Sequence, residues 1–183
     1  SERSRGLGDV YKRQDDNWLN HRSVHLDDQR AHHIRTVLKP SVGDSLRAGI
    51  VGRQQGLALI TALTSEGVSL QVDFHVPPPS RHHFDIVLAL PRPKMLRRVL
   101  RTVAEFGVAH LHLINTARVE KSYWQSPLLA DAKVEEALLA GMERASDTLM
   151  PQVHRHQLFR PFVEDRLTSL CAGRPCWIAQ MGS

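Results

Sequence analysis

The sequence predicts an α/β protein with a small β-barrel at its N-terminal end, and three observations support this fold class. Between residues 45 and 75, short apolar segments are separated by glycines, which is typical of a β-rich unit. Beyond residue 85, strand-like and helix-like segments alternate, which is typical of a largely parallel sheet. Between these stretches, Pro77, Pro78 and Pro79 predict a stiff connector and therefore a boundary between two units.

Composition limits the class of protein before any motif is considered. The chain has 183 residues, 42% of them hydrophobic, and 24 Lys and Arg against 19 Asp and Glu give a net charge of +5. This is a globular composition with a basic balance, long enough for one domain or two small ones. No apolar run approaches the roughly 18 to 20 residues that span a bilayer, and the N-terminus lacks the apolar stretch of a signal peptide, so we expect a cytoplasmic protein without a membrane partner.

The N-terminal third divides into a leader and the predicted barrel. Residues 1–14 (SERSRGLGDVYKRQ) show no periodicity and resemble translated adapter sequence, so we expect a disordered or artefactual leader. Residues 15–76 are the predicted barrel, and residues 77–82 are the proline-rich linker. Within the barrel the patterns predict one helix over residues 29–38 and strands over 45–51, 57–63 and 68–75.

Residues 83–183 form the second predicted unit, which opens with a strand–helix–strand motif. Its predicted elements are strands over 85–90, 110–115, 153–158 and 175–180, and helices over 93–106, 131–146 and 161–171. The chain ends directly after the last of these strands. Ligands of open α/β sheets bind outside the carboxyl ends of the strands, so we expect the chain to be cut short near a binding loop.

The first helix of this unit carries the most informative charge pattern. Five cations precede any acid in it: Arg92, Lys94, Arg97, Arg98 and Arg101. Four of them recur at helical spacing on one face, opposite an apolar stripe. Cations near a helix N-terminus oppose the helix macrodipole by about 0.3 to 1 kcal/mol each, which favours a functional reason for them. A row of this length indicates a phosphodiester backbone, although a solvated basic face is the alternative.

Histidines and cysteines are the other candidate ligands. The pairs His110/His112 and His154/His156 would each share one strand face, but no third metal ligand has a convincing spacing, so we predict no metal site. Cys171 and the cysteine five residues later are too few for a disulfide framework, and we expect reduced thiols. No nucleophile elbow, P-loop or GxGxxG motif is present.

A charged and aromatic loop follows the second strand of this unit. It contains Arg118 and Glu120 next to Tyr123 and Trp124. Such groups suit nucleic-acid contact by stacking and ion pairing, and a packed loop is the alternative.

These residues also carry a resemblance to a known family. The stretches ALPRPKMLRRVLRTVAEFGVAHLHLINTARVEKSYWQSPLL, MERASDTLMPQV and HHIRTVLKPSVGDSL resemble the RsmE-type 16S rRNA uridine-N3 methyltransferases of the SPOUT superfamily. The likeness runs from about Val24 to Ala179. It implies an N-terminal PUA-like barrel that holds RNA and a SPOUT domain that binds S-adenosylmethionine and acts as a homodimer on 16S rRNA of the small ribosomal subunit.

The resemblance also places individual residues. Lys94 and Arg118 match basic positions of the family, while Asp147 stands where the family has an arginine, which puts an RNA or active-site role there in question. The family's GPEGG loop and LGxxILRxETA segment, which make most of the cofactor pocket, would lie beyond Ser183. The resemblance therefore implies that cofactor-binding residues lie outside this chain, and it identifies no catalytic base.

Two other functions remain open at this point. A non-catalytic RNA-binding module needs only the barrel and the basic helix. A metal-dependent enzyme would depend on the two HxH pairs alone.

Overall fold

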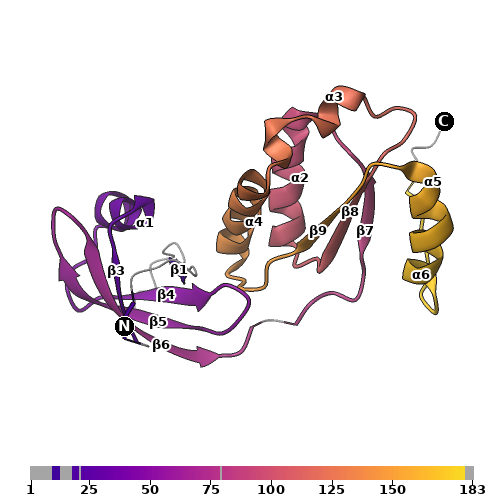
Figure 1. Ribbon diagram of the computed structural model, residues 1–183. Helices are drawn as coiled ribbons and strands as arrows, with labels where there is room; N and C mark the ends of the chain where they lie inside the picture. Colours follow the sequence, from indigo (N-terminus) through magenta and orange to yellow (C-terminus); the bar gives the residue numbers. More distant parts are fainter. Residues whose placement is uncertain (1–9, 13–17, 21, 79, 180–183) are drawn as a thin grey trace.

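The computed structural model describes residues 10–12, 18–20, 22–78 and 80–179, which form two units side by side (Figure 1). The first is a mainly antiparallel sheet with one helical segment. The second is a three-stranded parallel sheet with helices on both faces.

The first unit contains six strands in the order β1-β4-β5-β6-β3-β2. Its elements are β1 (Val10–Lys12), β2 (Trp18–Asn20), β3 (Ser23–Leu26), α1 (Gln29–His33) continuing into the π-helical η1 (Ile34–Leu38), β4 (Ser45–Ile50), β5 (Gln55–Leu63) and β6 (Val68–Val76). Alternate side chains of the strands are buried, among them Leu46, Ile60 and Leu70. Ala31 and Ile34 of the helical segment complete this core, as period-2 strands beside an amphipathic helix require.

The described strands form an open sheet, so the expected closed barrel is not observed. Closure would require the two edge strands to pair, but β1 pairs only with β4 and β2 pairs only with β3 among the described residues. The predicted helix and the three longer strands are confirmed to within two residues at each end.

Part of the expected leader is also ordered. Val10–Lys12 forms β1, which pairs in parallel with β4 through the register Val10↔Ala48. Without β1, the free edge of β4 would present unpaired backbone N–H and C=O groups. The short segment Val10–Lys12 pairs with that edge. The expectation of disorder is therefore wrong for these three residues, and the rest of the leader lies outside the described residues.

The second unit has the strand order β7-β8-β9, all parallel. Its elements are β7 (Ile86–Ala89), α2 (Pro93–Glu105), β8 (His110–Ile114), α3 (Lys121–Trp124), η2 (Pro127–Leu129), α4 (Asp131–Ala145), β9 (Gln152–His156), α5 (Phe159–Pro161), the π-helical η3 (Phe162–Leu167) and α6 (Thr168–Cys171). Helices α2 and α4 cover one face of the sheet, and the helical segment from α5 to α6 lies on the other side (Figure 1). The predicted strand–helix–strand motif and parallel sheet are confirmed.

Helices α2 and α4 pack closely because one residue between them has no side chain. A Cβ on Gly141 would lie 2.2 Å from the Arg101 carbonyl oxygen and 2.8 Å from the Cβ of Ala104. Leu111 and Leu113 of β8 bury themselves under this helix pair, while the histidines that alternate with them face the opposite side.

Two expectations for the C-terminal segment are wrong. Residues 175–179 of the predicted last strand form no strand, and Trp177 and Ile178 are 90% and 93% exposed; Gln180 lies outside the described residues. Arg174 donates to Asp85 Oδ2 (2.8 Å), which ties this segment beside the start of β7 instead of in the sheet. The two cysteines form a disulfide, Cys171–Cys176, because the turn at Gly173 (φ +69°) brings their Cα atoms to 6.1 Å.

Among the described residues, no helix combines the length and the apolar character needed to cross a bilayer.

Candidate functional site

The basic helix α2 starts at the carboxyl end of β7, an edge strand of the parallel sheet whose residues are half-buried or exposed. It follows β7 after three residues, with Arg92 at the N-cap and Pro93 as the first helical residue. Pro93 suits this position because it has no N–H to leave unpaired. Arg118 lies in the loop after β8, the next strand of the parallel sheet. The structure therefore brings both basic segments to the same edge, where open α/β sheets bind ligands.

The apolar stripe of α2 fixes which way its cations point. Leu96, Leu100 and Val103 are buried, whereas Arg92, Lys94, Arg97 and Arg98 are exposed. Arg101 is half-buried, and its Nε has no hydrogen-bond partner among the described residues. Four of the five predicted cations are thus on the solvent side of the helix, and Arg101 lies at the border with α4.

Acidic neighbours neutralise this row only in part. Arg97 lies 3.4 Å from Glu136 of α4, which Lys133 also contacts at 3.0 Å. Lys133 first, and then Arg97 and Arg101, hold the pKa of Glu136 below its ordinary value. Within the described part of the chain, no carboxylate forms an ion pair with Arg92, Lys94 or Arg98 of the row. The same holds for Arg118 in the loop after β8.

The aromatic loop after β8 is packed rather than presented for stacking. Trp124 Nε1 donates to Asn115 Oδ1 (3.2 Å), and Tyr123 Oη donates to Glu120 Oε1 (3.0 Å). Both rings lie against the core of the second unit. The structure thus favours the packed alternative for these rings, while Arg118 and Lys121 of the same stretch are exposed.

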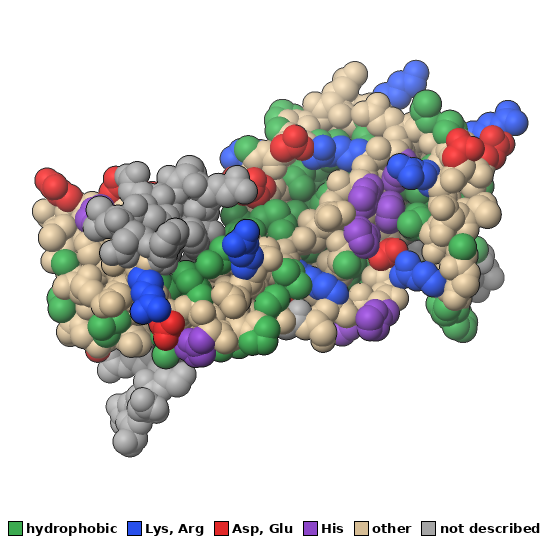
Figure 2. Space-filling view, turned by 60° about the horizontal axis from the view of Figure 1, so that its bottom comes forward, with side chains coloured by type: hydrophobic (Ala, Val, Ile, Leu, Met, Phe, Trp, Pro, Cys, Tyr) green, Lys and Arg blue, Asp and Glu red, His purple; other side chains and the backbone are tan. Residues whose placement is uncertain are grey.

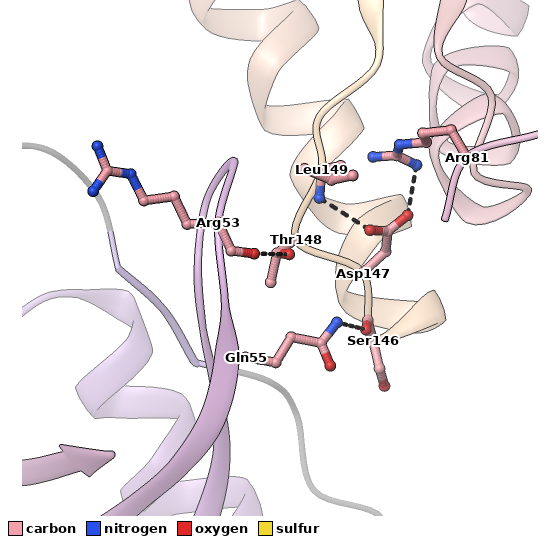
Figure 3. Close-up of polar contacts among 7 residues, drawn as sticks. All are labelled: Arg53, Gln55, Arg81, Ser146, Asp147, Thr148 and Leu149. Carbon is pink, nitrogen blue, oxygen red and sulfur yellow. Dashed lines mark hydrogen bonds and ion pairs between the residues drawn. The ribbon is translucent and has the colours of Figure 1, made fainter. Parts of the chain in front are cut away.

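A cluster of polar contacts that the sequence analysis did not anticipate joins the two units (Figure 3). Residues 146–148, between α4 and β9, dock on the β4–β5 hairpin; we call them the junction segment. Gln55 Nε2 donates to the Ser146 carbonyl (2.7 Å), Thr148 Oγ1 donates to the Arg53 carbonyl (2.5 Å), and Gly52 N donates to the Thr148 carbonyl (2.6 Å).

Asp147, at the centre of the junction segment, pairs with the linker. Its Oδ2 accepts from Arg81 Nη1 at 2.6 Å and its Oδ1 accepts from Leu149 N at 3.0 Å. The two charged side chains are 16% and 6% exposed. Burial lowers the pKa of Arg81, and Asp147 opposes that shift. Only the replacement of the family's arginine by Asp147 hinted at this pair, because the partners are 66 residues apart.

The two HxH pairs form one ladder on the face of the sheet opposite α2 and α4. His110 Nδ1 lies 3.1 Å from His154 Nε2, and His112 Nδ1 lies 3.1 Å from His156 Nε2. Figure 2 shows these histidines stacked on the second unit. Phe162, which is buried, lies against His112 and His156. We call His110, His112, His154 and His156 the histidine ladder.

Burial disfavours the charged form of three rings of the histidine ladder, His112, His154 and His156. Burial, followed by the neighbouring His154 and His156, lowers the pKa of His112 to about 4. Burial also lowers the pKa of His154 and of His156. Among the described residues, no group of three or more His, Cys, Asp or Glu is placed so that it could hold a metal ion.

Comparison with known proteins assigns the family. A family model described as an RNA methyltransferase domain matches residues 78–172, which is more than half of the chain. This chain belongs to the RNA methyltransferase domain family. Its matched region contains α2, the junction segment and the histidine ladder.

Individual relatives agree with the family. Ribosomal RNA small subunit methyltransferase E of Treponema pallidum is 33% identical over 136 residues, which are 74% of this chain and 51% of that protein. A probable rRNA-methyltransferase from Porphyromonas gingivalis has a similar fold (TM-score 0.64, 18% identity, 86% of this chain and 63% of that one). So has ribosomal RNA small subunit methyltransferase E from Neisseria gonorrhoeae, solved bound to S-adenosyl methionine (TM-score 0.62, 14% identity, 88% and 65%). The resemblance found in the sequence is confirmed, and the chain spans about half the length of its Treponema relative.

The described residues at the carboxyl edge do not by themselves fit S-adenosylmethionine. The exposed cations there are Arg92, Lys94 and Arg118, and a sulfonium ion is itself a cation. The exposed carboxylate of the loop, Glu120, already accepts from Tyr123. Asn115, a polar acceptor at this edge, already accepts from Trp124. The residues present therefore suit a polyanion, and we assign no cofactor contact to them.

Proposed function

We propose that this chain is the RNA-holding part of an S-adenosylmethionine-dependent methyltransferase that methylates uridine N3 in 16S rRNA of the small ribosomal subunit. The observation that carries this proposal is the exposed basic row of α2 at the carboxyl edge of a sheet in an RNA methyltransferase domain. The name of the Treponema relative supports small-subunit rRNA as the substrate, and the Neisseria structure supports the cofactor.

In this proposal the residues divide by role. Arg92, Lys94, Arg97 and Arg98 contact RNA phosphates, Arg101 supports the row from the α4 side, and Arg118 contacts RNA from the neighbouring loop. Residues 15–76 hold RNA as a PUA-like unit, and residues 83–183 are the N-terminal part of the methyltransferase domain, with the cofactor residues and a homodimer contact in the remainder of the whole protein. Uridine N3 carries a proton at neutral pH, so the complete site must also supply a base, which we do not assign to this chain.

A salt titration of RNA affinity tests the basic row. We expect Arg97→Ala with Arg98→Ala to weaken binding of single-stranded RNA and to reduce the slope of log affinity against log salt by about 1.4, because two phosphate contacts are lost. Filter binding between about 50 and 300 mM salt measures both quantities.

The matched control removes two cations elsewhere. Arg160→Ala with Arg166→Ala changes the net charge equally on the exposed helical segment beyond β9. If both double variants reduce the slope by the same amount, the basic row is only part of a diffuse charge and is not the phosphate contact.

A further inference from the structure

A cavity of about 290 Å³ opens where the two units meet. Its lining comes from β4, β5 and β6 of the first unit and from Ser146 and Thr148 of the junction segment. Figure 2 shows apolar side chains gathered on this face between the units, with Lys and Arg side chains at the border. This cavity, which we call the junction pocket, is separate from the basic row of α2.

The floor of the junction pocket is apolar and shallow. Leu57 and Val76 line it and are 50% and 43% exposed, so water covers apolar surface that a ligand could cover instead. Gly56 lets β5 approach β6 closely beside these side chains, since a Cβ there would lie 1.7 Å from the Asp73 carbonyl oxygen. An apolar surface of this size suits an aromatic ring system.

The other lining groups suit a nucleotide. Arg47 and His75 are exposed members of the lining, and Gln55, Ser146 and Thr148 add amide and hydroxyl groups. Asp73 lies 3.7 Å from His75 and offsets some of the positive charge. Arg and His side chains stack on bases or pair with phosphates, and apolar side chains cover the face of a base.

The volume and the position limit which nucleotide can enter. At about 290 Å³ the pocket is at the small end of ligand sites. It is large enough to hold one base and too small to hold a duplex. The three hydrogen bonds between the junction segment and the β4–β5 hairpin hold its two walls together before any ligand binds. A preformed pocket avoids the ordering cost of closing two units around a ligand.

We propose that the junction pocket binds one unpaired nucleotide of RNA, with its base over Leu57 and Val76 and its phosphate toward Arg47. This inference rests on the proposed function, because it assumes that the chain binds RNA. The pocket would be a second RNA contact that accepts only an unpaired base, whereas the basic row contacts only the phosphate backbone.

A pair of charge-matched variants tests the pocket. Leu57→Glu places a carboxylate on the floor, and Leu59→Glu places the same charge on the same strand and face, two residues away and outside the lining. We expect Leu57→Glu to weaken binding of a single-stranded RNA of about ten nucleotides by about tenfold, and Leu59→Glu to change it less than about twofold. The neutral variant Leu57→Asn should show a smaller loss in the same direction.

Photo-crosslinking supplies a readout of location. With one 4-thiouridine in the same RNA, we expect crosslinked peptides that contain residues 55–57 or 75–76 in the unmodified chain, fewer of them in Leu57→Glu, and no change in Leu59→Glu. Equal loss of affinity in both glutamate variants, or crosslinks only at other residues, overturns the pocket.

The two proposals fail in different ways. If the unmodified chain binds RNA with the expected salt slope but does not crosslink at the pocket, the pocket is wrong and the proposed function stands. If the unmodified chain binds no RNA at any salt concentration, the proposed function is wrong and the pocket with it.

Discussion

At the scale of single residues, Asp147 shows how one substitution acquires a structural role. It stands where the resembling family has an arginine, and here it forms a buried ion pair with Arg81 of the linker while accepting a backbone hydrogen bond within its own turn. Ser146 beside it adopts the left-handed conformation (φ +53°) that ends α4 and directs Asp147 toward the linker. Asp147 therefore ties the linker to the end of α4.

A double-mutant cycle measures this pair. We expect Arg81→Ala and Asp147→Ala each to lower the free energy of unfolding by about 3 kcal/mol, because each leaves its partner's charge buried and unpaired. The double variant should cost clearly less than the sum of the two. Urea denaturation followed by circular dichroism gives the four free energies.

The surface pair Arg144–Glu105 is the control for that cycle. Its nitrogen and oxygen lie 3.7 Å apart, and its side chains are 71% and 40% exposed. We expect a coupling of less than about 0.5 kcal/mol there. Additive costs at Arg81 and Asp147 would contradict a direct interaction between them.

At the scale of elements, the histidine ladder couples the parallel sheet to the helical segment on its second face. Phe162 of η3 packs on His112 and His156 while the rings are neutral. Charging the ladder would place like charges within stacking distance, since the His112 and His154 ring centroids are 4.4 Å apart. Asp85 offsets this repulsion in part, while Arg166 adds to it at His154 and His156.

This packing predicts that stability falls in acid. The pKa of His112 is about 4 in the folded chain against 6.5 ordinarily, so the unfolded chain binds more protons between these pH values. The contribution of His112 to the free energy of unfolding is therefore fully present above about pH 6.5. It declines as the pH falls toward 4, by at most about 3 kcal/mol. Urea denaturation at a series of pH values measures the decline.

Replacement of the buried ring tests the cause. His112→Leu should flatten the pH dependence between 4 and 6.5, whereas His33→Ala, on the exposed side of α1 and outside the ladder, should leave the profile as it is. An unchanged profile in His112→Leu would mean that other groups cause the acid sensitivity.

At the scale of the whole molecule, the junction joins the unit that carries the basic row to the unit that supplies most of the junction pocket. Residues 146–148 make this connection through hydrogen bonds from the second unit to the β4–β5 hairpin. We do not assign cofactor binding to this part of the molecule. The exposed cations at the carboxyl edge of the parallel sheet, Arg92, Lys94 and Arg118, repel a sulfonium ion.

Calorimetry with S-adenosylmethionine tests this division. We expect no binding by this chain and binding by a chain that continues past Ser183. Binding by neither would support the non-catalytic RNA-binding module instead, and binding by this chain alone would show that its described edge is a cofactor site after all. Salt-dependent RNA binding by this chain is the control that it is folded and functional.

How much could be predicted from the sequence differs between local and distant features. Periodicity placed α2, β8 and α4 within about one residue of their observed ends, because each buries an apolar stripe or run whose spacing is written in consecutive residues. The cationic row could be predicted for the same reason. The absent last strand, the Cys171–Cys176 disulfide and β1 could not, because each depends on what lies beside the segment in space.

By itself, the sequence determined the order of the elements, the basic helix and the family, since these follow from local patterns and from the identity of consecutive residues. Only the tertiary structure decided that Arg81 meets Asp147, that four histidines form one ladder, and that a pocket opens between the units. The physical reason is that these features join side chains 44 to 95 residues apart, and such contacts are fixed by the packing of whole elements.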